Sequence, residues 1–500
     1  MQNEETSAKR LNAEAVTTSS FFIRHSAFVL IALLALAVRL PQLGVRPMHT
    51  DEAINAYLTG QSLGGEKYHY DPQDRHGPAL VELTLPIVRL EGATTFASLT
   101  EAQLRLVPVL VGSAMILLFG AGVELFGFIP CLVAALLFAF APLPVYYSRY
   151  FIHETLFVAA TFGLILSGAR AWQRKTLLSA ALAGLCAALM LACKETAGLH
   201  FFALGLAVAI GWRLRATGKI PPLTIWFATT ISFLVAGILL FTWFGRDWSA
   251  LADLFRAVPH LAARAGGEGH EKPFWYYLKL LAGGWSGGAI LALTLLGISR
   301  ATGSFVRISL LTYAVLMGVI YCAIPYKTPW LALNLWLPLT LLAGFASEWI
   351  WFATTKVSRR AAILIFCGVL GLLLAHDTHK YVFQIPADER NPYAYAHTTE
   401  GLLDLPVRLE ELARQNHIPN PRIAVIAADA WPLPWYLRHF SQVGFWQPNQ
   451  ETGDADFFIT TTDISDPLQE RLKNYRSEFF GARPNVLLLL WSPPKPNSPP

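Results

Sequence analysis

Runs of about twenty apolar residues recur along most of this 500-residue chain, and they limit its possible folds more than any other feature. The hydrocarbon core of a bilayer is about 30 Å thick, so a membrane-spanning helix needs about 20 apolar residues. The composition agrees, because charged residues make up 15% of the chain, against about 25% in soluble proteins. We therefore predict an α-helical polytopic membrane protein.

The apolar runs predict about eleven membrane-spanning helices. Their approximate ranges are 26–44, 104–123, 129–147, 155–171, 177–193, 197–212, 222–244, 276–298, 305–324, 330–352 and 360–376. The first run resembles a signal peptide, but no small-residue cleavage site follows it. We interpret it as an uncleaved first helix.

The loops between these helices differ in charge, which predicts the orientation of the chain. With the N-terminus inside, the inner loops at 171–175, 213–219, 299–307 and 355–360 are all basic, whereas the loop at 124–130 has no Lys or Arg. Cytoplasmic loops carry the excess of Lys and Arg in membrane proteins. We predict a multi-pass protein of the plasma (inner) membrane, with residues 1–25 cytoplasmic and the C-terminal part exterior or periplasmic.

The predicted domain organisation follows from these spans. Residues 26–376 form a transmembrane domain with an outer loop at 45–100, and the Gly-rich stretch at 266–272 is interpreted as a mobile outer loop. In the tail, apolar β-type runs at 423–428, 457–460 and 486–490 alternate with helix-like pieces at 405–415 and 466–475. This alternation predicts a small exterior α/β domain over 377–490. The Pro-rich end at 491–500 is predicted to be disordered.

The charge distribution argues against nucleic-acid binding, and the cysteine spacing argues against a cysteine-ligated metal site. The net charge of +5 resides mostly in the short loops, where it sets topology and does not indicate nucleic-acid binding. The five cysteines lack metal-ligand spacing, so we predict no metal site from them and interpret them as small core residues.

The first outer loop contains the most informative residues of the sequence. Asp51 and Glu52 follow the first apolar run closely, beside His49. Adjacent carboxylates at a membrane surface could act as a general base with a supporting acid. They could also bind a divalent cation, the one cofactor that the sequence leaves open. A third reading is purely structural, since acidic residues favour the first turn of a helix.

Further ionisable or aromatic residues are predicted at the same outer side of the membrane. Basic residues are expected to be few there. A single lysine at such a position usually extends its amine to the interface, but several ionisable groups near membrane depth usually face a cavity. The candidate substrate-binding residues are Arg39, His76, Arg149, His153, Glu154, Lys194, Glu195, Tyr326 and Lys327.

Such a set of side chains suits a lipid-linked anion. Arg and Lys at the membrane boundary can neutralise a polyprenyl phosphate, and Tyr and Trp offer stacking surface for a sugar. A carboxylate could deprotonate an acceptor hydroxyl, which would displace the lipid phosphate from the anomeric carbon. The phosphate is stable as an anion, so this leaving group needs positive charge but no general acid.

Several short motifs in order along the chain resemble one family. MHTDEA (48–53) is followed by Tyr70-Asp71-Pro72 and His76-Gly77-Pro78, then by RYFIHE (149–154), CKETA (193–197), PYKTPW (325–330) and WPLPWYLR (431–438). The pattern resembles the GT-C membrane glycosyltransferases. More narrowly, it is similar to the Agl23-like "flippase activity-associated" group, related to the dolichyl-phosphate-mannose-protein mannosyltransferases (glycosyltransferase family 39) and the lipid A aminoarabinose transferase.

The resemblance implies a polyprenyl-phosphate-linked donor and inverting transfer of the sugar. It implies that Asp51 is the catalytic base and Glu52 a supporting acid, and that His76 belongs to the second motif of the first outer loop. Arg149, Glu154, Lys194 and Lys327 would then line the phosphate and sugar pocket. The acceptor stays open: another lipid-linked glycan, a protein or a polysaccharide.

Two alternative functions have to be weighed against transfer. A lipid-linked sugar flippase, or an accessory protein of one, should have polar groups or broken helices near the bilayer midplane. The spans contain few charges there, although Asn334 is polar. A functional tail with a helical anchor is the other alternative, but eleven helices exceed what anchoring needs. We therefore predict a membrane glycosyltransferase.

Overall fold

The computed structural model describes residues 26–73, 75–215, 219–267 and 269–494, and these form two compact units. The helical bundle comprises residues up to Pro41, Lys67–Leu80 and Arg105–Gln384. The α/β unit comprises Gln42–Glu66, Val81–Leu104 and the chain from Ile385 onward. The predicted cytoplasmic segment 1–25 lies outside the described residues, as does the end of the predicted disordered tail.

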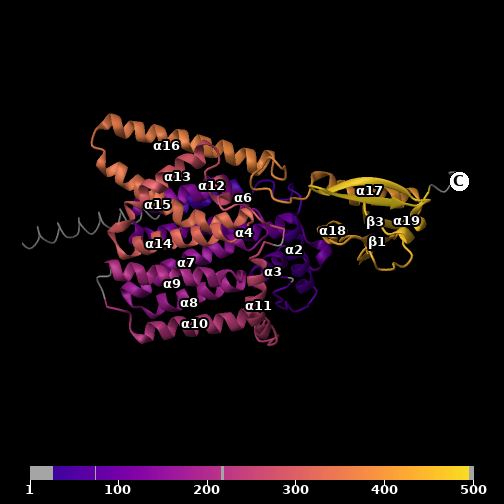
Figure 1. The fold of residues 1–500 in the computed structure, drawn as a ribbon, viewed down its shortest axis with the longest axis horizontal. Helices are drawn as coiled ribbons and strands as arrows, with labels where there is room; N and C mark the ends of the chain where they lie inside the picture. The colour runs from indigo at the N-terminus through magenta and orange to yellow at the C-terminus, as the bar shows by residue number, and fades with distance from the viewer. Residues whose placement is uncertain (1–25, 74, 216–218, 268, 495–500) are drawn as a thin grey trace, which may run out of the picture. The chain divides into compact units, whose positions relative to one another are not determined.

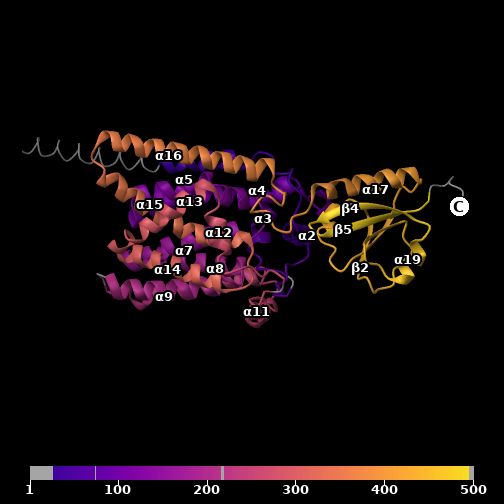
Figure 2. The same ribbon diagram turned by 45° about the horizontal axis from the view of Figure 1, so that its top comes forward.

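The bundle is built from helices that run along one another (Figures 1 and 2). Its elements are a first helix Ser26–Arg39, α4 (Glu101–Phe126), α5 (Phe128–Phe140), α6 (Pro142–Tyr147), α7 (Glu154–Arg174), α8 (Leu177–Cys193), α9 (Ala197–Arg215), α10 (Leu223–Phe241), α11 (Ala250–Arg264), α12 (Tyr276–Leu281), α13 (Gly284–Ile298), η2 (Ala301–Gly303), α14 (Phe305–Ala323), η3 (Pro329–Leu331), α15 (Ala332–Ala353), α16 (Val357–Thr378) and η4 (His379–Gln384). The first four residues of α4 belong to the α/β unit.

Among the described residues, seven helices are long and apolar enough to cross a membrane. They are Glu101–Phe126, Glu154–Arg174, Ala197–Arg215, Leu223–Phe241, Phe305–Ala323, Pro329–Ala353 and Val357–Gln384. Three further apolar helices, Ser26–Arg39, Phe128–Phe140 and Leu177–Cys193, are shorter. The polytopic membrane fold is thereby confirmed, whereas the number of eleven spans is not.

Two predicted spans are each divided into two helices. The run 129–147 is divided between α5 and α6, where Pro142 takes the first position of the new helix. This is a favoured position for proline, because it has no N–H to bond there. The run 276–298 is divided between α12 and α13, where Gly284 has a φ of +68°. Only glycine adopts such a backbone without strain.

Close backbone approach between helices depends on small residues. A Cβ on Gly297 of α13 would lie 1.8 Å from the Leu342 carbonyl oxygen of α15, and one on Gly184 of α8 would lie 2.2 Å from that of Thr229 on α10. In membranes, small residues let helices pack by van der Waals contact where no hydrophobic force drives association. These contacts position the helices whose ends carry the candidate residues.

Two of the basic loops, 171–175 and 299–307, contact the loop at 124–130 or residues beside it at one end of the bundle. Arg174 forms an ion pair with Glu124, and Arg307 donates to the Phe126 carbonyl oxygen at 2.8 Å and to Glu348 at 3.0 Å. The loop at 124–130 therefore has no Lys or Arg of its own, but the side chains of Arg174 and Arg307 from neighbouring segments contact it. We call this end of the bundle the basic end.

The α/β unit contains the sheet that the tail sequence predicts. Its elements are α2 (Thr50–Leu63), α3 (Ala79–Leu90), η1 (Phe96–Ser98), η5 (Glu400–Leu403), α17 (Asp404–Gln415), β1 (Arg422–Ile426), α18 (Leu433–Tyr436), β2 (Gln442–Trp446), β3 (Phe457–Thr461), α19 (Asp466–Leu472), β4 (Arg476–Arg483) and β5 (Val486–Ser492). The first two residues of α3 belong to the bundle.

The strand order is β2-β1-β3-β5-β4, with the first three strands parallel and the last two antiparallel to their neighbours. Leu468 and Leu472 of α19 pack with Ala424, Ile426 and Phe458 on one face of the sheet. Figure 2 shows α17 on the opposite face. The small C-terminal α/β domain is confirmed; its boundary at 377 and the disorder of its end stay predictions, although β5 already includes Trp491 and Ser492.

We expect Gly297→Ala to destabilise the bundle, because the new Cβ would collide with the backbone of α15. Overpacking in a well-packed core typically costs about 1–3 kcal/mol. Thermal unfolding in detergent, followed by tryptophan fluorescence, measures the loss. The matched control is Gly318→Ala on α14, where a Cβ meets nothing within 4 Å. Equal melting temperatures for the two variants would contradict the packing account.

Candidate functional site

The N-terminus of α2 carries the acidic residues of the first outer loop. His49 is the N-cap residue, and its ring nitrogen Nδ1 accepts a hydrogen bond from the Asp51 backbone N–H at 3.1 Å. The Glu52 side chain accepts from the His49 backbone N–H at 3.2 Å. This reciprocal capping box satisfies two backbone donors that have no partner within the helix.

The hydrogen bonds of His49 indicate one neutral tautomer. Nδ1 accepts from the Asp51 N–H, so it carries no proton, and Nε2 lies 3.1 Å from the Tyr395 carbonyl oxygen, to which it can only donate. Burial lowers the pKa of His49, although the charges of Asp51 and Glu52 oppose the shift. His49 therefore holds the start of α2 as a neutral side chain.

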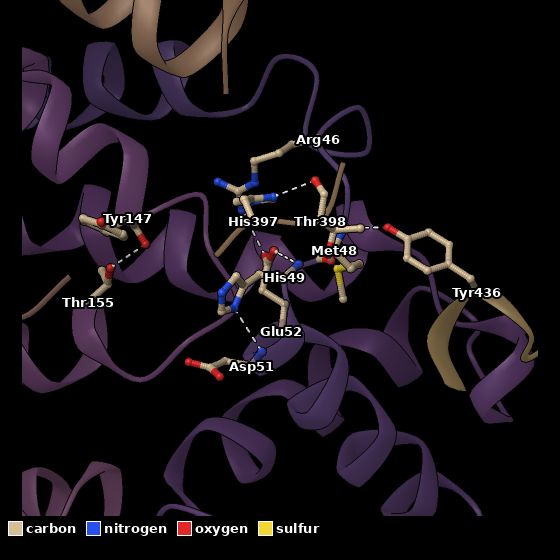
Figure 3. A network of polar contacts seen from close by, with 10 residues as sticks. All are labelled: Arg46, Met48, His49, Asp51, Glu52, Tyr147, Thr155, His397, Thr398 and Tyr436. Atoms are coloured by element: carbon tan, nitrogen blue, oxygen red, sulfur yellow. Dashed lines mark hydrogen bonds and ion pairs between the residues drawn. The ribbon is translucent and has the colours of Figure 1, made fainter. Parts of the chain in front are cut away.

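Asp51 and Glu52 differ sharply in their surroundings (Figure 3). Glu52 is fully buried and its Oε1 lies 3.1 Å from the Arg46 guanidinium, with which it forms an ion pair. Asp51 is half-buried, and its carboxylate accepts no hydrogen bond or ion pair from any residue that the structure describes. Figure 3 shows the Asp51 carboxylate pointing away from Arg46 and from the Glu52 carboxylate. Glu52 is thus committed to the fold, whereas Asp51 is available for chemistry.

Residues from the tail complete this part of the α/β unit. The Thr398 hydroxyl donates to the Met48 carbonyl oxygen at 2.6 Å, and the Met48 N–H donates to the Tyr436 hydroxyl at 2.8 Å. The rings of His397 and His49 lie edge to face with centroids 5.7 Å apart. The tail therefore anchors the segment that precedes Asp51 on both sides of Met48.

A second group of candidate residues lies in the bundle, around Glu195 between α8 and α9. Glu195 accepts from the Tyr70 hydroxyl at 2.8 Å, and its other oxygen lies 3.0 Å from His76 Nδ1. Burial alone would raise the pKa of Glu195, but the charge and hydrogen bond of His76, with a hydrogen bond from Tyr70, lower it to about 2. Glu195 is therefore ionised at neutral pH and is a weak base.

Gly77 explains why the motif His76-Gly77-Pro78 can reach this position. A Cβ on Gly77 would lie 2.2 Å from the Ala192 carbonyl oxygen near the end of α8. Only glycine permits this approach. Since His153 Nε2 lies 3.3 Å from the Gly77 carbonyl oxygen and its ring lies 5.4 Å from that of His76, the motif brings these two histidines together.

Lys194 and Glu154 form an ion pair next to this group. Lys194 Nζ lies 2.5 Å from Glu154 Oε1, and both side chains are buried. Glu154 begins α7 directly after His153, and Lys194 directly follows the last residue of α8 and precedes Glu195. The ends of α7 and α8 therefore hold four of the predicted residues.

Arg39 and Arg149 form a third group, which joins the end of the first helix to α5 and α6. Arg39 donates to the Ser148 hydroxyl at 2.7 Å and to the Phe138 and Ala139 carbonyl oxygens at 2.6 and 2.9 Å. Arg149 donates to the Arg39 carbonyl oxygen at 2.7 Å and lies over the Phe383 ring. These bonds account for the burial of both guanidinium groups; their predicted contact with a phosphate stays a prediction.

Tyr326 and Lys327 lie after α14, where they pair with the Gly-rich outer stretch. The His270 and Tyr326 rings have centroids 4.8 Å apart, and the Lys327 N–H donates to the His270 carbonyl oxygen at 3.0 Å. Lys327 Nζ donates to the carbonyl oxygens of Lys272, at 3.2 Å, and Ile324. Burial lowers the pKa of Lys327. Residues 270–272 are thus tied to this turn, and their predicted mobility stays untested.

The structure therefore distributes the predicted residues over separate groups. His76, His153, Glu154, Lys194 and Glu195 come together in the bundle, Arg39 with Arg149 and Tyr326 with Lys327 form two more groups there, and Asp51 and Glu52 lie in the α/β unit. Within the described residues, no three His, Cys, Asp or Glu side chains gather as metal ligands would. The possible divalent cation stays a prediction.

The sequence reasoning missed three residues that contact the predicted ones. Tyr70 belongs to an aromatic and polar run that could have indicated it. Arg46 lies two residues before the start of the motif MHTDEA. His397 had no signal, because it is remote in sequence and lies in an irregular stretch of the tail.

Comparisons with known proteins bear on this fold. The family described as "Dolichyl-phosphate-mannose-protein mannosyltransferase" matches residues 90–241. Among solved structures, the chain is similar to ArnT from Cupriavidus metallidurans bound to undecaprenyl phosphate, with 14% identity, a TM-score of 0.63, and coverage of 92% of this chain and 97% of that one. No curated protein sequence matches the chain.

A second similar structure is the archaeal oligosaccharyltransferase AglB from Archaeoglobus fulgidus, in complex with an inhibitory peptide and a dolichol-phosphate. It has 14% identity, a TM-score of 0.57, and coverage of 96% of this chain and 75% of that one. The family match over residues 90–241 and the shared fold agree with the predicted resemblance to the GT-C membrane glycosyltransferases. The narrower likeness to the Agl23-like group stays a prediction.

We expect the N-terminus of α2 to loosen in acid. The pKa of His49 is lowered from its usual value of about 6.5, so the stability that neutral His49 contributes is complete above that pH and is lost as the pH falls through the lowered value. The protection of the Asp51 amide against hydrogen exchange, relative to the intrinsic exchange rate at each pH, should therefore decrease as the pH falls below the usual His value of about 6.5. His49→Asn, which keeps a capping acceptor without a titratable ring, should remove this decrease; its persistence would contradict the role of His49.

Proposed function

We propose that this protein transfers a sugar from a polyprenyl-phosphate-linked donor to an acceptor at the outer face of the membrane, with Asp51 as the general base. The observation that carries the proposal is the contrast between two neighbouring carboxylates. Glu52 is buried and bonded to Arg46 and to the His49 N–H. Asp51, one residue before it, keeps a half-buried carboxylate that no described residue engages.

The reaction assigned to Asp51 is a displacement at the anomeric carbon. Asp51 accepts the proton of the acceptor hydroxyl while the acceptor oxygen forms a bond to that carbon. The bond between the carbon and the phosphate oxygen breaks, and the polyprenyl phosphate leaves with the electron pair. One such displacement inverts the anomeric configuration. A positioned base of this kind contributes about 10²–10⁴-fold to the rate.

Glu195 is a poorer candidate for the base. Its two oxygens are already engaged by Tyr70 and His76, and its pKa of about 2 makes it a weak proton acceptor. Glu154 is paired with Lys194. We assign these residues to substrate binding.

We propose that cations at the helix ends bind the lipid phosphate. Lys194 is the leading candidate, because its amine can contact both Glu154 and the phosphodiester of the donor, which carries one negative charge, and can stabilise the further charge on the departing phosphate. Lys327 and Arg149 are further candidates. The similar ArnT structure has undecaprenyl phosphate bound, and the similar AglB structure is a complex with a dolichol-phosphate. Both molecules are polyprenyl phosphates, which is the class of carrier proposed here.

The proposed setting is the plasma (inner) membrane, with the N-terminus cytoplasmic and the α/β unit outside. The basic end of the bundle would then face the cytoplasm, as the positive-inside rule requires. His76, His153, Glu154 and Lys194 belong to loops that alternate with those of the basic end along the chain. They would therefore face the exterior.

We expect Asp51→Asn to lower the turnover of a polyprenyl-phosphate sugar about 10²–10⁴-fold, without loss of folded protein. Sugar release from a panel of such donors by the purified full-length protein measures the effect. The matched control is Glu52→Gln, which should lower the melting temperature because it weakens a buried pair. Its amide oxygen can still accept from the His49 N–H, so the start of α2 should keep its orientation and turnover per folded molecule should fall only a few-fold.

The opposite pattern would overturn the assignment. If Asp51→Asn turned over as fast as the wild type while Glu52→Gln lost activity with its fold intact, the base would be Glu52. If neither the wild type nor a variant released sugar but reconstituted vesicles moved the donor across the membrane, a lipid-linked sugar flippase would be the better reading.

A further inference from the structure

A cavity of about 410 Å³ lies within the bundle, and none of the predicted site residues lines it. Five helices form its wall: α7, α8, α9, α10 and α14. Its volume falls in the range of roughly 300–1,000 Å³ that is typical of ligand pockets. Most lining residues belong to the half of their helix nearer the basic end, or to its centre; Phe201 lies nearer the other end of α9, and Pro221 precedes α10.

The lining is almost wholly apolar. It includes Leu164, Trp172, Phe201, Leu204, Val208 and Phe305. Polar groups that do line the cavity are mostly engaged elsewhere: the Tyr313 hydroxyl bonds to His200 at 2.7 Å, and the Thr229 hydroxyl to the Ile225 carbonyl oxygen at 3.0 Å. The Ser309 hydroxyl is buried and has no hydrogen-bond partner among the described residues. Water would find few partners here, so the cavity suits hydrocarbon.

The membrane setting identifies the source of that hydrocarbon. Four of the five helices are long and apolar enough to span the bilayer, and the fifth, α8, is a shorter apolar helix. The surrounding solvent at this depth is lipid chains. A hydrocarbon chain of a lipid is therefore the occupant that can enter without desolvating polar groups.

The charge beyond the cavity indicates the lipid's head group. Leu204, Val208 and Arg215 are spaced by four and seven residues on α9, so they lie on one face of the helix. Arg215 is exposed at the end of α9. The N-termini of α10 and α14 begin close in sequence to the lining residues Ile225 and Phe305, and helix N-termini favour anions. An anionic head group suits this end.

We infer that the cavity binds one acyl chain of an anionic glycerophospholipid, whose phosphate contacts Arg215 at the basic end of the bundle. A zwitterionic lipid offers the same chains but no net charge to Arg215. The site is independent of the proposed transfer reaction, since none of its lining residues belongs to the groups assigned to substrate.

Two glycines allow the cavity to be filled without a clash. Gly168 and Gly205 both line it, and a Cβ built on either meets nothing within 4 Å. Gly205→Phe and Gly168→Phe should therefore fold while their rings occupy the space of the acyl chain. Gly198 on α9 is equally open but does not line the cavity, so Gly198→Phe is the matched control.

The experiment measures phosphatidylglycerol and phosphatidylcholine bound to the full-length protein in detergent by native mass spectrometry. The wild type and Gly198→Phe should retain phosphatidylglycerol in preference to phosphatidylcholine. Gly205→Phe and Gly168→Phe should bind it at least about tenfold more weakly, which corresponds to about 1.4 kcal/mol. Gel filtration and the melting temperature show whether each variant is folded. If one of the two cavity-filling variants does not fold, the other provides the test.

Arg215→Gln tests the head group. It should abolish the preference for phosphatidylglycerol and leave phosphatidylcholine binding unchanged. Arg213→Gln is its control, because Arg213 is exposed on another face of α9. Equal retention of phosphatidylglycerol by the wild type and both cavity-filling variants would overturn the site. Displacement of phosphatidylglycerol from the cavity by added polyprenyl phosphate, with tighter binding of the latter, would overturn the assigned occupant.

Discussion

The buried Glu52 carboxylate is the interaction on which the proposed chemistry depends. An ionised carboxylate away from water is costly unless it is paired and hydrogen-bonded, and Glu52 has the Arg46 guanidinium and the His49 N–H as partners. These bonds fix the start of α2. Since Asp51 lies in the same turn, its orientation is set by bonds that its own carboxylate does not make. The fold therefore orients Asp51 without using its carboxylate.

In the bundle, buried charged side chains likewise fix the positions of helix ends through their ion pairs and hydrogen bonds. The Lys194–Glu154 pair joins the ends of α7 and α8, and Arg39 joins the first helix to the carbonyl oxygens at the end of α5. Each cation is thus both a structural link and a candidate ligand of phosphate. Removing one partner would leave the other charge buried, at a cost of about 3–5 kcal/mol. Loss of activity in such variants has to be separated from loss of fold.

The sequence predicted the features that depend on local pattern. Apolar length predicts helices such as α9 and α14, and alternating apolar runs predict β1, β3 and β5. It missed β2 and β4, because β2 is half exposed and β4 is mostly polar, as edge strands usually are. The break between α12 and α13 was missed as well, since Gly283 and Gly284 interrupt a run whose hydropathy is continuous.

The roles of the candidate site residues depend on more than residue type. The family resemblance assigned the base to Asp51 and a supporting role to Glu52, and the structure adds that Glu52 is buried and bonded whereas the Asp51 carboxylate is half-buried. Similarly, His397 contacts His49 from a part of the chain that is distant in sequence, a relation that no local pattern encodes. The motif around Gly77 was recognised, yet its physical reason, an approach to the Ala192 carbonyl oxygen, emerged only from the fold.

Chemical rescue at position 51 tests the central claim most directly. Asp51→Cys, in a background in which the exposed Cys367 is replaced by alanine, should be inactive in sugar transfer. Alkylation with iodoacetate would restore a carboxylate at that position and should restore part of the turnover, whereas iodoacetamide, which adds an uncharged amide, should not. Full activity before alkylation, or equal rescue by both reagents, would contradict the assignment of Asp51 as the general base.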